Sequence, residues 1–223
     1  FAFAFLMQTS MSFLREVFRP HNEPILEGEM PQKKETLRNN LLYISVGMIG
    51  TAAVIAFIVY LNFTLVVPTF VFFFFFIVLT LVYAIPLFQF VNRGFGEMIL
   101  SVHIAYIVPS IAFLFQANEN SRLLSNLLLP LMVLALAYFL ILNFTTFQDD
   151  EKYDRGTLLR RLGWERAVPL HHSLIAFAYI SFALAPLFGI TFNMVAPAFL
   201  TLPFAIFQVF QLRSIANGAS PNW

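Results

Sequence analysis

Apolar residues occur in long stretches that are nearly free of charge and are separated by shorter polar segments. A helix needs about 20 mostly apolar residues to cross a bilayer, and at this length in lipid only a helix satisfies every backbone hydrogen-bonding group. The stretches that are long enough are 40–63, 64–91, 97–115, 123–144, 167–188 and 190–212. The pattern therefore predicts an all-α protein, a polytopic transmembrane helix bundle.

Composition supports a membrane protein and excludes some kinds of site. Apolar residues make up 59% of the chain and charged residues 11%, against roughly 25% charged residues in an ordinary soluble domain. The absence of cysteine excludes a disulfide framework and a thiolate ligand or nucleophile. The net charge of +1 gives no indication of nucleic-acid binding. We expect the partners to be membrane lipid and other membrane protein subunits, and no nucleic acid.

The basic residues fall in alternate connections between the predicted helices. One set of connections holds Arg15, Arg19, Lys33, Lys34, Arg38, Arg93, Lys152, Arg155, Arg160, Arg161, Arg166 and Arg213. The opposite set holds only Arg122. Because loops rich in Lys and Arg stay on the cytoplasmic side, the charged loops are predicted to be cytoplasmic, in a bacterial inner membrane or an organelle membrane.

The chain is interpreted as a single integral-membrane domain, 1–223, with cytoplasmic loops at 15–39, 89–97 and 145–166. The first segment, "FAFAFLMQTSMSFL", is too short to span a bilayer and lacks the basic start of a signal peptide. We interpret it as part of a longer helix, and the chain is expected to lack a helix at each end.

Three polar stretches carry a resemblance to a known family. They are "SFLREVFRPHNEPILEGEM", "VYAIPLFQFVNRGFGEMI" and "NFTTFQDDEKYDRGTLLRRLGWERA". The first resembles an aspartate-rich loop that ends in N-x-P, the second a helix end leading to R-G-x-G-E, and the third a second aspartate-rich loop that ends in T-L-x-x-R-L-G. In this order the stretches resemble the UbiA superfamily of intramembrane aromatic prenyltransferases, of the chlorophyll synthase or quinone-pathway type.

The resemblance implies a fold and a chemistry. It implies a bundle of about nine helices, of which about seven are present here, around a cavity open to lipid. The family transfers a polyprenyl group from its diphosphate to an aromatic or tetrapyrrole acceptor. Magnesium, held between carboxylates of the two aspartate-rich loops, neutralises the departing diphosphate. An apolar cavity protects the allylic cation from water.

The first loop departs from the family pattern. Alignment on N-x-P places Met11 at the family's asparagine, and Ser12, Arg15 and Arg19 at its three aspartates. Arg15 and Arg19 are four positions apart and would share one face of a helix. They could bind a phosphate or a lipid head group directly, but they could not hold magnesium.

The second loop fits the family in two registers. In one, Asp150 and Asp154 form a D-x-x-x-D pair on one helical face, and both would be catalytic magnesium ligands. The gapless register, which we favour, places Thr146 and Asp150 at the two aspartates, Asp154 at a glycine and Asn143 at the family's asparagine. Asp150 is retained in both. The alternative is that these acids merely balance the neighbouring bases on a solvated loop.

The middle loop offers a further anion-binding residue. Arg93, Gly94, Gly96 and Glu97 fit the family, and the glycines suit a tight turn with positive φ. Arg93 could contact the diphosphate, or it could form a plain interfacial ion pair with Glu97.

His103 lies within a predicted helix, where an ionisable residue suggests a functional site. It could ligate the magnesium of a chlorophyll-type pigment or bond a quinone carbonyl. The alternative is a neutral histidine that is hydrogen-bonded to a neighbouring helix.

These observations leave two functions open, and they do not favour a transporter because no helix carries a charged relay. The loss of every first-loop acid favours a catalytically degenerate member that contacts lipid, quinone or pigment as a subunit of a larger membrane complex. The alternative is an active, magnesium-dependent prenyltransferase, with a diphosphate site formed by Arg93, Asn143, Arg15 and Arg19.

Overall fold

The computed structural model describes residues 1–20, 22–25, 31–119 and 121–219. Every regular element among them is a helix, so the all-α prediction is confirmed. The α-helices are α1 (Ala2–Val17), α2 (Pro31–Asn62), α3 (Val67–Ala84), α4 (Gly96–Val102), α5 (Val108–Ala117), α6 (Arg122–Thr145), α7 (Phe147–Lys152), α8 (Leu158–Leu162), α9 (Trp164–Leu184), α10 (Phe192–Phe199) and α11 (Leu202–Ala216). Three short elements join them: η1 (Phe90–Asn92), η2 (His103–Ile107) and η3 (Ala185–Phe188).

Six helical segments of the described chain are long and apolar enough to cross a membrane. They are Lys33–Asn62, Val67–Ala84, Gly96–Ala117, Arg122–Thr145, Trp164–Phe188 and Phe192–Ala216. Together with the shorter α1 they give the seven helices expected from the sequence. The protein is therefore an integral, multi-pass membrane protein.

Prolines account for the boundaries that the hydropathy pattern misplaced. The predicted helix 64–91 ends at Ala84, because a residue that precedes a proline is pushed out of the α region and Pro86 follows Ile85. Ile85 accordingly has φ −65° and ψ 137°. At the other boundary α2 begins at Pro31 rather than at residue 40, so a polar helical segment of more than two turns extends the apolar span. Part of the predicted loop 15–39, namely residues 21 and 26–30, lies outside the described residues.

The third span contains one wide turn. Residues His103–Ile107 form a π-helix between α4 and α5, and the N–H of Val108 donates to the carbonyl of His103. Pro109 follows directly, and a proline lacks an N–H and crowds the preceding turn. A wide turn accommodates that crowding without breaking the helix.

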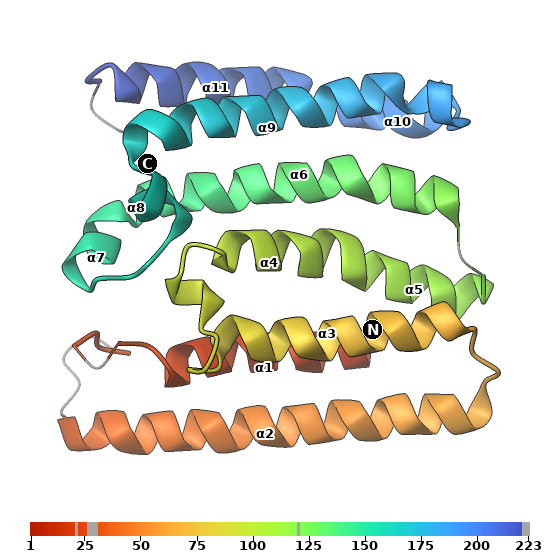
Figure 1. The fold of residues 1–223 in the computed structure, drawn as a ribbon, viewed down its shortest axis with the longest axis vertical. Helices are drawn as coiled ribbons and strands as arrows, with labels where there is room; N and C mark the ends of the chain where they lie inside the picture. Colours follow the sequence, from red (N-terminus) through yellow and green to blue (C-terminus); the bar gives the residue numbers. More distant parts are fainter. Residues whose placement is uncertain (21, 26–30, 120, 220–223) are drawn as a thin grey trace.

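In Figure 1 the helices follow one another in a row that runs from α2 through α1 and α3, then α4 and α5, to α6, α9 and α11. The connections between consecutive helices lie alternately at one end and at the other end of the helices. One end carries the α1–α2 connection, η1, α7 and α8, and we call it the charged end (Figure 1). The single base of the opposite connections, Arg122, begins α6 at the other end. The alternation inferred from the basic residues is thus present in the fold.

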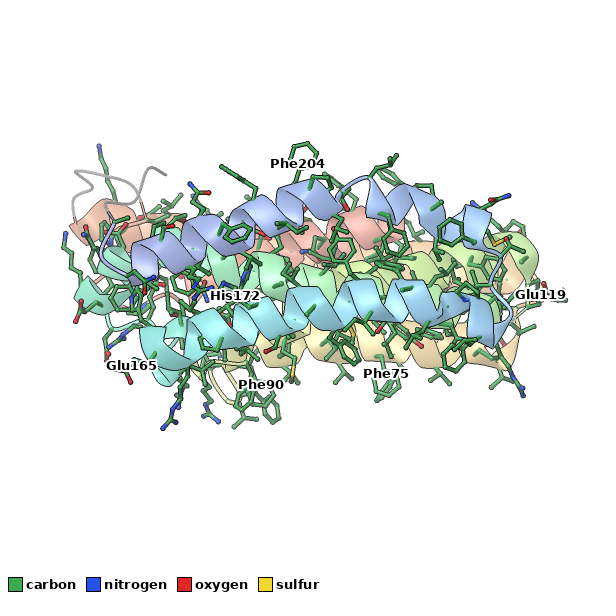
Figure 2. The ribbon with its side chains drawn as sticks, turned by 90° about the horizontal axis from the view of Figure 1, so that it is seen from above. Phe75, Phe90, Glu119, Glu165, His172 and Phe204 are labelled. Carbon is green, nitrogen blue, oxygen red and sulfur yellow. The ribbon has the colours of Figure 1, made fainter. Side chains whose placement is uncertain are left out.

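Phenylalanine both fills the core and covers the outside of the bundle. Phe73 and Phe76 of α3 are buried, while Phe75 on the same helix is exposed. Phe75 and Phe204 point away from the bundle on opposite faces (Figure 2). An apolar exterior of this kind suits a hydrocarbon environment.

Candidate functional site

A pocket of about 380 Å³ opens at the charged end, where the three polar connections meet. Its wall combines charged loop residues with apolar side chains of the spanning helices. The lining residues are Arg15, Arg19, Pro20, Glu23, Tyr83, Val91, Asn92, Gly96, Glu97, Leu100, Phe139, Leu142, Asn143, Thr145, Thr146, Asp150, Arg155 and Thr157. Residues that are distant in sequence therefore form one candidate site.

Arg155 lies between two buried carboxylates of this pocket. Its Nε atom is 3.1 Å from both carboxylate oxygens of Glu23, and its Nη2 atom also contacts Glu23 Oε1. Its Nη1 atom donates to Asp150 Oδ1 at 2.8 Å. Glu23 and Asp150 are each 1% exposed. The Glu23 carboxylate raises the pKa of Arg155 most; burial opposes this, and Asp150 adds to the rise.

The two arginines that the sequence placed at aspartate positions are also paired with acids. Arg19 contacts Glu16 and lies 2.9 Å from Glu23, measured from Nη1 to Oε1. Arg15 donates to Glu16 Oε1 from Nη2 at 3.0 Å. Burial acts to lower the pKa of Arg15, but Tyr83 and Glu16 outweigh it and the pKa is raised. Both arginines line the pocket. The predicted shared helical face is wrong, however, because α1 ends at Val17 and Arg19 lies beyond it.

Glu97 connects the middle loop to the second charged loop. Asn143 donates from its side-chain amide to Glu97 Oε1, and the backbone N–H of Leu158 donates to the same oxygen at 3.1 Å. Glu97 is 6% exposed, and its other oxygen, Oε2, is buried without a hydrogen-bond partner in the part of the chain that the structure describes. Thr157 Oγ1 is likewise buried and unpartnered. Both of these residues line the pocket.

Glycines permit the two loops to approach so closely. Gly94 has a φ of 78°, as the predicted tight turn requires. Gly96 has no positive φ; instead it lies against the backbone of Val91, where a Cβ would be 3.0 Å from Val91 Cα. A Cβ on Gly156 would lie 1.7 Å from the carbonyl oxygen of Asn92. The middle and second loops are therefore in direct backbone contact.

Most of the predicted site residues meet in the pocket, but one anion-binding candidate does not. Arg15, Arg19, Asn143 and Asp150 line it, whereas Arg93 is exposed and is not among the lining residues. The structure gives no ion pair between Arg93 and Glu97 either, since both residues are described and Glu97 is bonded to Asn143 instead.

Asp154 and Asp150 do not share a helical face, which corrects the D-x-x-x-D prediction. The helix α7 ends at Lys152, and Asp154 lies beyond it with a φ of 56°. Its side chain is 89% exposed and pairs with Arg160 at 2.9 Å. Glycine adopts this left-handed conformation most readily, so the geometry agrees with the gapless register, which puts Asp154 at a glycine position.

His103 is fully buried outside the pocket. Its ring packs edge-on against Phe76, with the ring centres 4.1 Å apart. Both ring nitrogens are buried without a hydrogen-bond partner among the described residues. The expected hydrogen bond to a neighbouring helix is therefore wrong.

Sequence reasoning missed Glu23 and the central role of Arg155. Glu23 occupies the variable position of the N-x-P motif, and Arg155 belongs to a run of charges in which no member stands out. The contact between them spans 132 residues. A local pattern carries no signal for such a pair.

The donor set does not fit magnesium, which prefers unobstructed oxygen ligands in octahedral geometry. Both oxygens of Asp150 are engaged, by Thr146 Oγ1 at 3.1 Å and by Arg155. Both oxygens of Glu23 face the Arg155 guanidinium. Within the described ranges no group of three His, Cys, Asp or Glu residues is arranged to hold a metal. The Arg155 guanidinium lies between the Glu23 and Asp150 carboxylates, in the place where a metal ion bound by both would have to lie.

The spanning bundle and the polar pocket at its charged end define an integral membrane protein with a candidate site where its polar connections meet. The model of the UbiA prenyltransferase family matches residues 24–222. The match covers most of the chain, and this protein belongs to the UbiA prenyltransferase family. Neither a curated protein nor a solved structure matches the chain.

Proposed function

We propose that this chain is a catalytically degenerate member of its family, which holds a lipid, a quinone or a pigment as a subunit of a larger membrane complex. The observation that supports this most directly is the position of Arg155 between Glu23 and Asp150. The two carboxylates best placed to hold a divalent cation are already neutralised by the protein itself.

The charge balance of the pocket argues in the same direction. Three arginines line it, and so do three acids, Glu23, Glu97 and Asp150. Ionisation of an allylic diphosphate requires cationic charge that is free to neutralise the leaving group. The guanidinium groups of Arg19 and Arg155 are already paired with carboxylates. Little positive charge remains for a diphosphate.

The remainder of the molecule suits a binding subunit. Leu100, Phe139 and Leu142 give the pocket an apolar wall for a hydrocarbon group. The phenylalanines exposed on the outside, such as Phe75 and Phe204, offer a surface for lipid or for helices of other subunits. With the basic loops on the cytoplasmic side, the pocket opens toward the cytoplasm.

One observation favours the alternative, an active transferase. Asp150 and Asn143, which the resemblance places at the diphosphate site, both line the pocket. If a diphosphate displaced Arg155 from Asp150, that carboxylate could take part in binding a single magnesium ion. Asp150 and Asp154 would then not act together, because Asp154 is on the surface.

Binding of a non-hydrolysable geranylgeranyl diphosphate analogue to the purified full-length protein, with and without magnesium, separates the two functions. The proposal predicts no magnesium-dependent binding by the folded protein. Micromolar binding that requires magnesium and is lost in Asp150→Asn would overturn it. Asp154→Asn is the matched control, since it removes the same charge from the same loop outside the pocket.

A further inference from the structure

Two residues of the pocket wall, Glu97 and Thr157, each carry a buried polar atom that has no hydrogen-bond partner among the described residues, Glu97 Oε2 and Thr157 Oγ1. A buried polar atom without a hydrogen bond loses its hydration without compensation, and the cost is larger if the atom is charged. Almost all such atoms in folded proteins are paired with protein, water or ligand. An unpaired carboxylate oxygen in a pocket wall therefore indicates a ligand that donates a hydrogen bond.

The orientation of the Glu97 carboxylate is fixed by its other oxygen. Oε1 accepts from the Asn143 amide and from the Leu158 backbone N–H. These two donors come from different parts of the chain, one in α6 and one at the start of α8. Because both bonds end on Oε1, Oε2 is the oxygen that is left for a ligand.

The charges of the pocket exclude an anionic head group next to Glu97. A negative ligand beside a buried carboxylate oxygen is repelled at short range, and the arginines of the pocket are already matched by acids. The adjoining surface, formed by Leu100, Phe139 and Leu142, is apolar. An uncharged head group that carries a hydroxyl satisfies both conditions.

We propose that this pocket binds an uncharged lipid through a hydroxyl group that donates to Glu97 Oε2. This inference rests on the proposed function as a binding subunit and names the ligand class of that site. The volume of about 380 Å³ lies in the range of small-molecule sites, roughly 300–1,000 Å³. A hydroquinone and a long-chain alcohol both present the required hydroxyl.

The test uses the full-length protein in detergent or nanodiscs and a matched set of probes. The first set is a long-chain hydroquinone, its dimethyl ether and the corresponding quinone. The second set is a polyprenyl alcohol and its methyl ether. The hydroxyl-bearing member of the relevant set is expected to bind at least about tenfold more tightly than its ether, since one charge-assisted hydrogen bond is worth about 1.5–3 kcal/mol. The set that shows the difference identifies the source.

The substitution Glu97→Gln is expected to remove the preference for the hydroxyl compound. The donors from Asn143 and Leu158 hold the amide oxygen at the position of Oε1, so the new NH₂ group takes the position of Oε2. An acceptor becomes a donor there, and because a hydroxyl, an ether and a carbonyl oxygen can all accept from it, the variant is expected to lose the preference for the hydroxyl compound over its ether and over the quinone. Glu165→Gln makes the same change in an exposed acid outside this pocket and is expected to leave the order of affinities unchanged.

Equal affinity of the wild-type protein for hydroxyl compounds and their ethers would overturn the inference, as would an unaltered order in a folded Glu97→Gln variant. The wild-type probe series decides the question even if that variant does not fold. Magnesium-dependent diphosphate binding would instead overturn the proposed function. If the protein shows neither a preference for hydroxyl compounds nor magnesium-dependent diphosphate binding, the proposed ligand class is wrong and the proposed function as a degenerate family member is not contradicted.

Discussion

Asp150 and Asp154 are four residues apart and lie in opposite environments. Asp150 is 1% exposed and bonded to Thr146 and Arg155 inside the pocket. The side chain of Asp154 is 89% exposed on the surface. The change from the end of α7 to a left-handed conformation at Asp154 separates them.

The two aspartates are therefore expected to differ in their effect on stability. Asp150→Asn removes a buried partner of Arg155 and should lower the free energy of unfolding by about 3 kcal/mol. Asp154→Asn breaks an exposed pair and should change it by less than about 1 kcal/mol. Denaturant or thermal unfolding in one detergent measures both. Equal effects would mean that Asp150 is solvated like its neighbour.

Arg155→Gln should be more damaging than loss of either acid alone. It leaves Glu23 and Asp150 buried without their cation, at a cost on the order of 3–5 kcal/mol. Arg166→Gln, an exposed arginine in the first turn of α9, is the control and should be close to neutral. Magnesium at millimolar concentration should not restore the Arg155→Gln variant. Restoration by magnesium would show that the two carboxylates can bind a metal once the guanidinium is removed.

The pH dependence of the Arg155 contribution follows from the raised pKa of its guanidinium. A group with a raised pKa in the folded state stabilises the protein fully below its unfolded value, and the effect is lost only as the pH rises through the folded value. The ordinary arginine pKa already exceeds about 12. The stability difference between wild type and Arg155→Gln should thus show no decline due to Arg155 between about pH 7 and 10. Unfolding curves across this range would reveal a decline.

Gly156→Ala tests the contact between the middle and second loops. A Cβ at this position would lie 1.7 Å from the Asn92 carbonyl oxygen, so one of the loops must move. We expect destabilisation of roughly 1–3 kcal/mol together with weaker ligand binding in the pocket. Gly50→Ala in α2 has no atom within 4 Å of the new Cβ and serves as the control. It should be neutral or slightly stabilising.

His103→Leu distinguishes a structural histidine from a ligand-binding one. Its two ring nitrogens are buried without partners among the residues that the structure describes, so replacement by an apolar side chain of similar size should stabilise the protein by about 1 kcal/mol or more. Unfolding in detergent measures the change. Loss of a co-purifying pigment or quinone, seen in the absorption spectrum, would instead assign His103 to ligand contact.

The sequence predicted the spanning helices well because hydropathy is a local property that each stretch carries by itself. It also placed Asp150, Asn143, Arg15 and Arg19 correctly in a common site, through motif positions. The hydropathy pattern did not predict where α3 ends, because the apolar stretch continues past Pro86 and hydropathy does not reflect the effect of a proline on the residue before it. The left-handed turn at Asp154 and the role of Glu23 depend on how the loops fold together, and no periodicity or spacing reports them.

The ion pair between Glu23 and Arg155 joins positions 132 residues apart, and this has a consequence for biogenesis. Chains are synthesised from the N-terminus, so the buried carboxylate of the first loop is made long before its cation. The pocket can close only after α6 and the second charged loop have been inserted. The pocket therefore forms late, and it forms only if the N-terminal and C-terminal halves of the bundle have both been inserted and packed together.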